Sequence, residues 1–196
     1  MPAADRPAVA ALRLPPIYAI TPEPDRDDFE SRLARLFAAG VSLVQLRAKR
    51  LPDAELRALA MRASTLAAAH GASLLLNDRI DLARELGLGV HLTATTLRGL
   101  RQRPLPPERW VGASCHDAAE LAHAAAIGAD FAVLAPVAPT PSHPGATPLG
   151  WPRFRALVAD ATLPVYALGG VGPDDAAAAI AAGGQGVAGI SAFWPK

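Results

Sequence analysis

Three polar residues at alternate positions follow a short apolar run in the stretch SLVQLRAK. Gln45, Arg47 and Lys49 are spaced by two. Because alternate side chains of a strand lie on one face, this spacing predicts that all three point the same way, with Val44 and Leu46 opposite. Arg and Lys are suited to binding phosphate or diphosphate. The alternative interpretation is a solvated strand end with ordinary surface charges.

Two further apolar runs end in residues suited to cation binding or proton transfer. Asn77 and Asp78 end one run, where an acid could hold Mg²⁺, although a cap for the next helix is the alternative. Ser114, Cys115 and His116 end the other. Alternation places Ser114 and His116 on one face and Cys115 opposite, which argues against a Cys–His dyad and predicts a buried cysteine. His116 is a candidate acid/base, and a hydrogen-bonded structural histidine is the alternative.

A proline-rich stretch and two glycine-rich stretches predict a phosphate site. LAPVAPTPSHPGATPLGW carries hydroxyls and a histidine between prolines that stiffen the backbone. Glycine-rich turns after the last two strands of a barrel bind phosphate through backbone N–H groups. A rigid solvent loop is the alternative for the proline-rich stretch. The residues assigned to the phosphate are Thr140, Ser142, His143, Gly170, Ile190 and Ser191.

The elements that must position these residues alternate along the chain. Eight apolar runs without polar alternation predict buried parallel strands, and helical spacing of apolar residues separates most of them. We expect a (β/α)₈ TIM barrel over residues 17–196, with an open doubly wound sheet as the alternative. Residues 1–16 are expected to be a leader. The chain ends five residues after Ser191, so the eighth helix is expected to be truncated, and the leader is one candidate for covering that place. The predicted strands are 17–21, 42–47, 73–77, 89–92, 110–114, 131–135, 164–170 and 186–191, and the predicted helices are 27–39, 52–70, 78–87, 117–128, 151–158 and 174–182.

Composition excludes several classes of protein. With 19 basic and 18 acidic residues and no block of one sign, the chain offers no electrostatic case for nucleic acid or an anionic membrane. Its apolar runs are shorter than the about 18 residues of a membrane span, and no signal peptide is expected. The single cysteine fits a reducing cytoplasm.

Seven segments together resemble the thiamin phosphate synthase family, which includes a thiazole tautomerase branch. They are VQLRAK, LLLNDR, GVHL, GASCH, APVAPTPSHPG, ALGGV and GVAGIS, within residues 17–192. The resemblance is strongest to a synthase-like domain found fused to Nudix hydrolases, which implies a Nudix association. A homo-oligomer is a further partner to test. In the synthase, hydroxymethylpyrimidine diphosphate loses pyrophosphate with the help of Mg²⁺ and is joined to a thiazole phosphate. The resemblance assigns the metal to Asp78, the diphosphate to Gln45, Arg47, Lys49, Asn77 and Ser114, and the thiazole phosphate to Thr140, Ser142, Gly170, Ile190 and Ser191.

Two positions depart from the synthase pattern. Thr96 stands where a second Mg²⁺-binding acid is usual, and His143 stands where a lysine is usual. Because both departures affect the leaving pyrophosphate, we expect a tautomerase-like or divergent enzyme that uses His116 as acid/base and needs no cofactor. A full synthase that uses Mg²⁺ and a non-catalytic module that binds thiazole phosphate are the alternatives.

Overall fold

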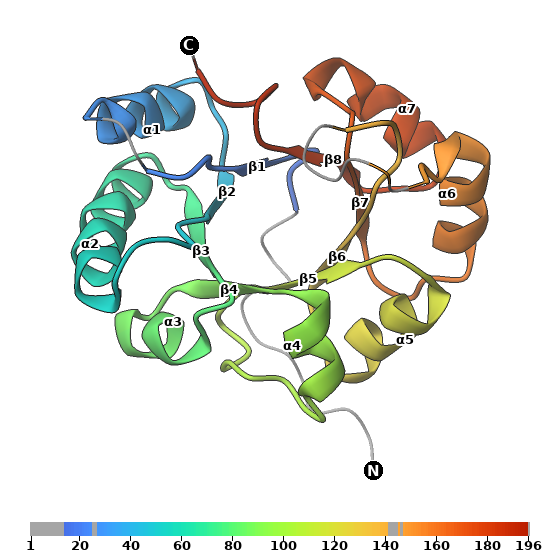
Figure 1. Cartoon of the computed structure of the whole chain (residues 1–196), viewed down its shortest axis with the longest axis horizontal. Helices are drawn as coiled ribbons and strands as arrows, with labels where there is room; N and C mark the ends of the chain where they lie inside the picture. Colours follow the sequence, from blue (N-terminus) through green and yellow to red (C-terminus); the bar gives the residue numbers. More distant parts are fainter. Residues whose placement is uncertain (1–13, 25–26, 141–144, 146, 196) are drawn as a thin grey trace.

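Eight parallel strands pair side by side in chain order, and the last pairs with the first, so the sheet closes into a barrel. Helices connect the strands and surround the barrel (Figure 1). The computed structural model describes residues 14–24, 27–140, 145 and 147–195. The closed sheet confirms the predicted (β/α)₈ TIM barrel and excludes the open doubly wound sheet.

The elements agree with the predicted ranges to within a few residues at most ends. The strands are β1 Ile17–Ile20, β2 Leu43–Leu46, β3 Ser73–Asn77, β4 Gly89–Leu92, β5 Val111–Cys115, β6 Phe131–Leu134, β7 Val165–Leu168 and β8 Gly186–Gly189. The helices are α1 Phe29–Ala38, α2 Asp53–Ala69, α3 Ile80–Leu86, α4 Ala94–Gly99, α5 Ala118–Ala126, α6 Gly150–Ala159 and α7 Ala176–Ala181, the last preceded by the 3₁₀ turn η2 Pro173–Asp175. None of these helices, nor any other within the described ranges, is long and apolar enough to cross a membrane.

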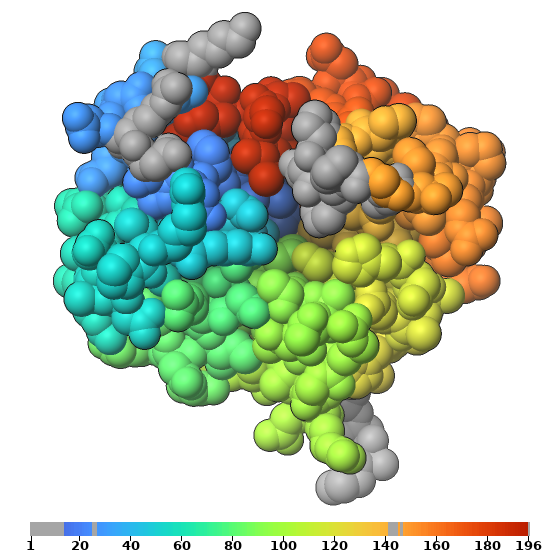
Figure 2. Space-filling view, viewed as in Figure 1, coloured from blue at the N-terminus to red at the C-terminus, as the bar shows by residue number. Residues whose placement is uncertain are grey.

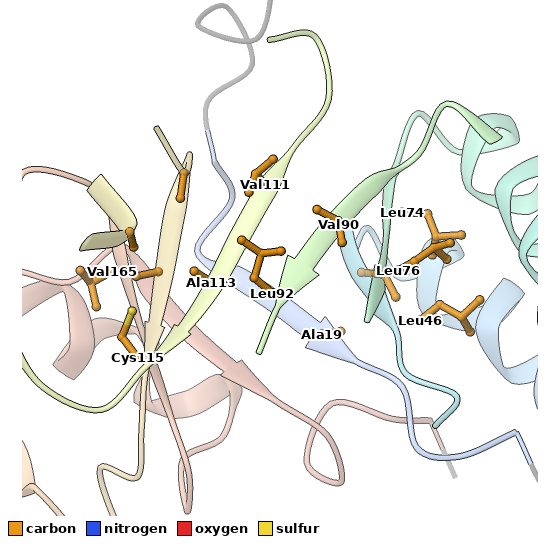
Figure 3. Packing of buried hydrophobic residues seen from close by; sticks show 14 of the residues in the cluster. Ala19, Leu46, Leu74, Leu76, Val90, Leu92, Val111, Ala113, Cys115 and Val165 are labelled. Atoms are coloured by element: carbon orange, nitrogen blue, oxygen red, sulfur yellow. The ribbon is translucent and has the colours of Figure 1, made fainter. Parts of the chain in front are cut away.

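The strands separate two apolar clusters. The barrel interior is filled mainly by aromatic and branched side chains, among them Tyr18, Leu75, Phe131 and Tyr166. The larger cluster lies between the sheet and the helices, and Figure 3 shows strand residues that belong to it. Cys115 is fully buried in this outer cluster, as alternation predicts, and burial raises the pKa of its thiol to about 12.

Hydroxyl and carboxyl caps begin the helices on either side of β5. Asp117 accepts a hydrogen bond of 2.8 Å from the Glu120 amide and begins α5. Thr93 caps α4 in the same way by accepting from the Thr96 amide at 3.2 Å. The sequence prediction missed α4 because this helix is short and has threonines in its first turn, where helix propensity is low.

Residues 14–16 lead into β1 and bond to the start of β8. The Gln185 side-chain amide donates to the Leu14 carbonyl at 2.7 Å, and the Val187 amide donates to the Pro16 carbonyl at 2.9 Å. Leu14 also packs against the interior cluster. These three residues of the expected leader therefore cover the end of the barrel where the strands begin. Residues 1–13 lie outside the described ranges.

The segment after β8 covers α1. Within residues 190–195 the chain forms turns and no helix. The Trp194 ring lies 5.1 Å from the Phe29 ring, and Arg32 Nε donates to the Pro195 carbonyl at 2.7 Å. Figure 2 shows the two ends of the barrel sequence, blue and red, side by side. The carboxyl-terminal segment therefore packs against α1, where an eighth helix is expected.

Candidate active site

A chain of hydrogen bonds runs through the barrel interior to the end of the barrel where the strands have their carboxyl ends, here called the mouth. Gln45 Nε2 donates to the Tyr18 hydroxyl at 3.1 Å, and this hydroxyl lies 3.1 Å from His91 Nδ1. His91 Nε2 lies 2.9 Å from Ser114 Oγ. Tyr18, Gln45 and His91 are buried, whereas Ser114 is partly exposed near the carboxyl end of β5. Neutral side chains thus link four strands to one hydroxyl at the mouth.

Burial keeps this chain uncharged at neutral pH. It lowers the pKa of His91 to about 4, with the negative charge of Asp78 acting in the opposite sense. Burial also raises the pKa of Tyr18 well above its ordinary value. His91 is therefore neutral, and Tyr18 keeps its proton.

The protonation states fix the direction of the bonds. Because Gln45 already donates to the Tyr18 oxygen, the Tyr18 proton is the donor to His91 Nδ1. The proton of neutral His91 is then assigned to Nε2, from which it is donated to Ser114 Oγ. The Ser114 hydroxyl proton is left to donate to a ligand at the mouth.

Arg47 and Lys49 lie beyond the end of β2, in the loop that follows it. Arg47 Nη1 lies 3.2 Å from Glu23 Oε1, and the Arg47 side chain is 28% exposed. Lys49 is exposed. Strand β2 ends at Leu46, so of the three only Gln45 belongs to it, and its side chain points into the barrel. The alternation continues beyond the strand, because Ala48 is buried in the same outer cluster as Val44 and Leu46. The common face of Gln45, Arg47 and Lys49 stays a prediction.

Asp78 is bound to the start of α4 rather than to its own helix. Its Oδ1 accepts from the Thr93 amide at 3.0 Å, and its Oδ2 accepts from the Thr93 hydroxyl at 3.1 Å and the Thr96 hydroxyl at 2.9 Å. Helix α3, which follows Asp78, has no side-chain cap. The alternative of a helix cap at Asn77 and Asp78 is therefore wrong. Asn77 ends β3 in register with His91.

The carboxylate of Asp78 is the candidate metal ligand at the mouth. Within the described ranges, no group of three or more His, Cys, Asp and Glu side chains could hold an ion. Mg²⁺ is, however, often bound by one or two carboxylates together with substrate phosphates. Asp78 fits that second arrangement as a single carboxylate, with the hydroxyls of Thr93 and Thr96 beside it.

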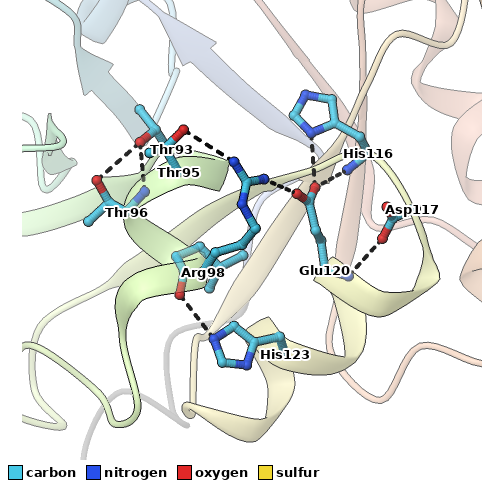
Figure 4. Close-up of polar contacts among 9 residues, drawn as sticks. Thr93, Thr95, Thr96, Arg98, His116, Asp117, Glu120 and His123 are labelled. Carbon is cyan, nitrogen blue, oxygen red and sulfur yellow. Dashed lines mark hydrogen bonds and ion pairs between the residues drawn. The ribbon is translucent and has the colours of Figure 1, made fainter.

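His116 belongs to a polar cluster between α4 and α5 (Figure 4). Its Nδ1 lies 2.9 Å from Glu120 Oε2, and the His116 amide donates to the same oxygen at 2.8 Å. Glu120 Oε1 pairs with Arg98 at 2.5 Å. Burial alone would raise the pKa of Glu120, but the bonds from His116 and Arg98 outweigh it and lower that pKa. His116 and Ser114, expected on one face, therefore have different partners.

The turns after β6 and β7 pack tightly against each other at the mouth. The Ala138 amide donates to the Gly169 carbonyl at 2.9 Å. Gly170 has a φ of +65°, and a Cβ there would lie 2.4 Å from the Pro139 carbonyl oxygen, so no other residue fits without a shift. Thr140 follows in the same loop and is partly buried, while Ile190 is partly buried and Ser191 exposed after β8. Ser142 and His143 lie outside the described residues.

Two residues of the interior chain were missed from the sequence. His91 stands in GVHL, where a histidine among apolar strand residues is an available signal for a buried polar contact. Tyr18 carries no comparable signal, because tyrosine is ordinary in a buried strand. The contact between them joins β1 to β4 and follows only from closing the barrel.

Comparisons with known proteins agree with this geometry. A family model described as thiamine monophosphate synthase matches residues 17–193. The thiamine-phosphate synthase of Thioalkalivibrio sulfidiphilus is 37% identical over 191 residues, which cover 94% of this chain and 90% of the relative. That of Methanoculleus marisnigri is 40% identical over 181 residues, covering 90% and 86%.

A solved structure points to the same group of proteins. Thiamine phosphate pyrophosphorylase from Pyrococcus furiosus superposes with a TM-score of 0.73 at 25% identity, covering 89% of this chain and 85% of the other. The family model spans the whole barrel, from β1 to the segment after β8. The chain therefore belongs to the thiamine monophosphate synthase family.

Proposed function

We propose that this chain is a thiamine-phosphate synthase, which joins hydroxymethylpyrimidine diphosphate to a thiazole phosphate. The bond between the pyrimidine methylene carbon and the diphosphate oxygen breaks, and pyrophosphate leaves with the electron pair. The lone pair of the thiazole nitrogen then forms the new carbon–nitrogen bond. No oxidant or reductant is needed, and the relatives described above carry this activity in their names.

The observation that carries the proposal is the contrast between Ser114 and His116. Ser114 ends an ordered chain of neutral hydrogen bonds and has its proton free to donate to a leaving oxygen. His116, which a tautomerase would need as acid/base, is hydrogen-bonded to Glu120, and its side chain is 54% exposed. The comparisons likewise do not support the expected preference for a tautomerase.

Each end of the proposed site has its own task. Arg47, Lys49 and Asn77 would bind the diphosphate. Gln45, also assigned to it, is held by its bond to the Tyr18 hydroxyl. Asp78 would hold Mg²⁺, which when bound would neutralise negative charge on the diphosphate. The tight turn at Gly170 would present backbone N–H groups to the thiazole phosphate. The residues proposed for that phosphate are Thr140, Ser142, His143, Gly170, Ile190 and Ser191.

The test is product formation by the purified chain supplied with both substrates and Mg²⁺. We expect thiamine phosphate and pyrophosphate in equal amounts. Asp78→Asn is the matched variant, because asparagine keeps the shape and tolerates the φ of +57° at this position. It should lower turnover by about 100-fold or more. Tautomerisation without pyrophosphate release would overturn the proposal, and so would thiazole phosphate binding without any turnover.

Three other expectations stay predictions. They are a cytoplasmic location, association with a Nudix hydrolase and homo-oligomer formation. The likeness to synthases supports a small phosphorylated thiazole and a pyrimidine diphosphate as ligands, and it offers no reason to expect nucleic acid.

A further inference from the structure

The pairing of β1 with β2 changes character where β1 ends. The Thr21 amide still donates to the Gln45 carbonyl at 2.9 Å. Pro22 and Pro24, on either side of Glu23, have no N–H group. Beyond Gln45, the amides of Arg47, Lys49 and Arg50 bond to side chains of the segment after β1 and not to its backbone.

Two side chains from the β1 end accept these bonds. Thr21 Oγ1 accepts from the Arg47 amide at 3.0 Å. Glu23 Oε1 accepts from the Lys49 amide at 3.2 Å, and Glu23 Oε2 accepts from the Arg50 amide at 3.4 Å. Alternate residues of one segment thus fix alternate residues of the other.

Glu23 also fixes the Arg47 side chain. Its Oε1 lies 3.2 Å from Arg47 Nη1, and its Oε2 lies 3.8 Å from Arg50 Nε. The Glu23 side chain is only 16% exposed, so its bonds are partly shielded from water. An arginine has five donors, which leaves donors of Arg47 for an anion after Glu23 is bound.

We propose that Glu23 is a positioning residue that holds residues 47–50 in the conformation that binds diphosphate. This proposal rests on the proposed function, since the diphosphate is the ligand that Arg47 and Lys49 would bind. The opposite role is also physically possible: a carboxylate beside Arg47 could compete with the anion. The two roles predict opposite changes in affinity when the carboxylate is removed, so affinity decides between them.

The experiment measures the dissociation constant of inorganic pyrophosphate by calorimetry, at fixed Mg²⁺, with the full chain. Glu23→Ala removes both acceptors and should weaken binding about tenfold, even though it removes a negative charge. Glu23→Gln keeps one acceptor oxygen and should stay within about threefold of the parent. Glu30→Ala is the control, because Glu30 pairs with Arg62 on the outer helices and its loss makes the same change in net charge. It should leave the affinity unchanged.

The melting temperature of each variant separates positioning from unfolding. If Glu23→Ala melts more than about 10 °C below the parent, Glu23→Asp replaces it, because aspartate keeps the charge but shortens the reach, and the same weakening is expected. The variant used for the comparison is Glu23→Ala, or Glu23→Asp where Glu23→Ala melts too low. If that variant binds pyrophosphate as tightly as the parent or more tightly, the positioning role is overturned and the proposed function is left intact. Failure of the parent chain to bind pyrophosphate at all would overturn both.

Discussion

Polar side chains are held in place differently in the barrel interior and in the loops at its mouth. In the interior, Tyr18, Gln45 and His91 are buried and uncharged, and each is fixed by another strand of the closed sheet. At the mouth, charged residues are carried by loops and are held by other charges or by hydroxyls, as Arg47 is by Glu23. Under the proposed function, the interior would orient a ligand with little change on binding, and the mouth would supply the charge that attracts it.

The largest effect is expected from the interior and concerns stability. Folded His91 has a pKa of about 4, below the 6.5 of an unfolded histidine, so the unfolded chain binds more protons between these values. The contribution of this residue to the free energy of unfolding is present above pH 6.5 and is lost as pH falls toward 4, by up to about 3 kcal/mol.

His91→Gln isolates that contribution, because glutamine keeps polar contacts but does not titrate. Denaturant unfolding of both proteins between pH 7 and pH 4 should show a steeper loss of stability in the parent. Equal slopes would mean that His91 titrates normally, and the neutral interior chain would then be wrong.

The next largest effect is expected at the mouth. Arg47→Ala removes a charged donor from the diphosphate and should weaken inorganic pyrophosphate binding by about 100-fold. Arg62→Ala is the matched control, since Arg62 pairs with Glu30 on the outer surface. Raising the salt concentration should weaken binding by the parent more than binding by Arg47→Ala. Similar losses in both variants would show that only overall charge matters.

The smallest effect is expected at His116. Its ring is bound to Glu120 on α5, so His116→Ala should change synthase turnover by less than about threefold while lowering the melting temperature slightly. A loss of about 100-fold, as acid/base catalysis requires, would restore His116 to the reaction. Turnover and melting temperature measured on one preparation distinguish the two.

The sequence predicted the barrel because its signal is local to each element. Eight apolar runs separated by helical spacing survive small errors at their ends. Alternation also correctly placed Gln45 on the opposite face from Val44 and Leu46, and Cys115 on the opposite face from Ser114. Strand β2 ends at Leu46, but the alternation continues to Ala48, which is buried in the outer cluster with Leu46. The sequence did not predict that the side chains of Thr21 and Glu23 hold the residues beyond the strand.

The missing parts of the site depend on contacts between distant segments. Tyr18 and His91 are 73 residues apart and meet only in the closed barrel. The bonds from Thr93 and Thr96 to Asp78 likewise require the start of α4 to reach the end of β3. From the sequence, Thr96 is only the residue that replaces a usual Mg²⁺-binding acid. In the fold, its hydroxyl donates to the carboxylate of Asp78.

The most direct test of the separate roles of the interior and the mouth compares Ser114→Ala with Arg47→Ala in one steady-state assay of pyrophosphate release. Under the proposed function, Ser114 would donate to charge that develops on the leaving group, so its loss should lower kcat about tenfold with little change in KM. Arg47 would bind charge that is already present in the substrate, so its loss should mainly raise KM for the pyrimidine diphosphate. The same change in kcat and KM for both variants would contradict the separate roles of the interior and the mouth.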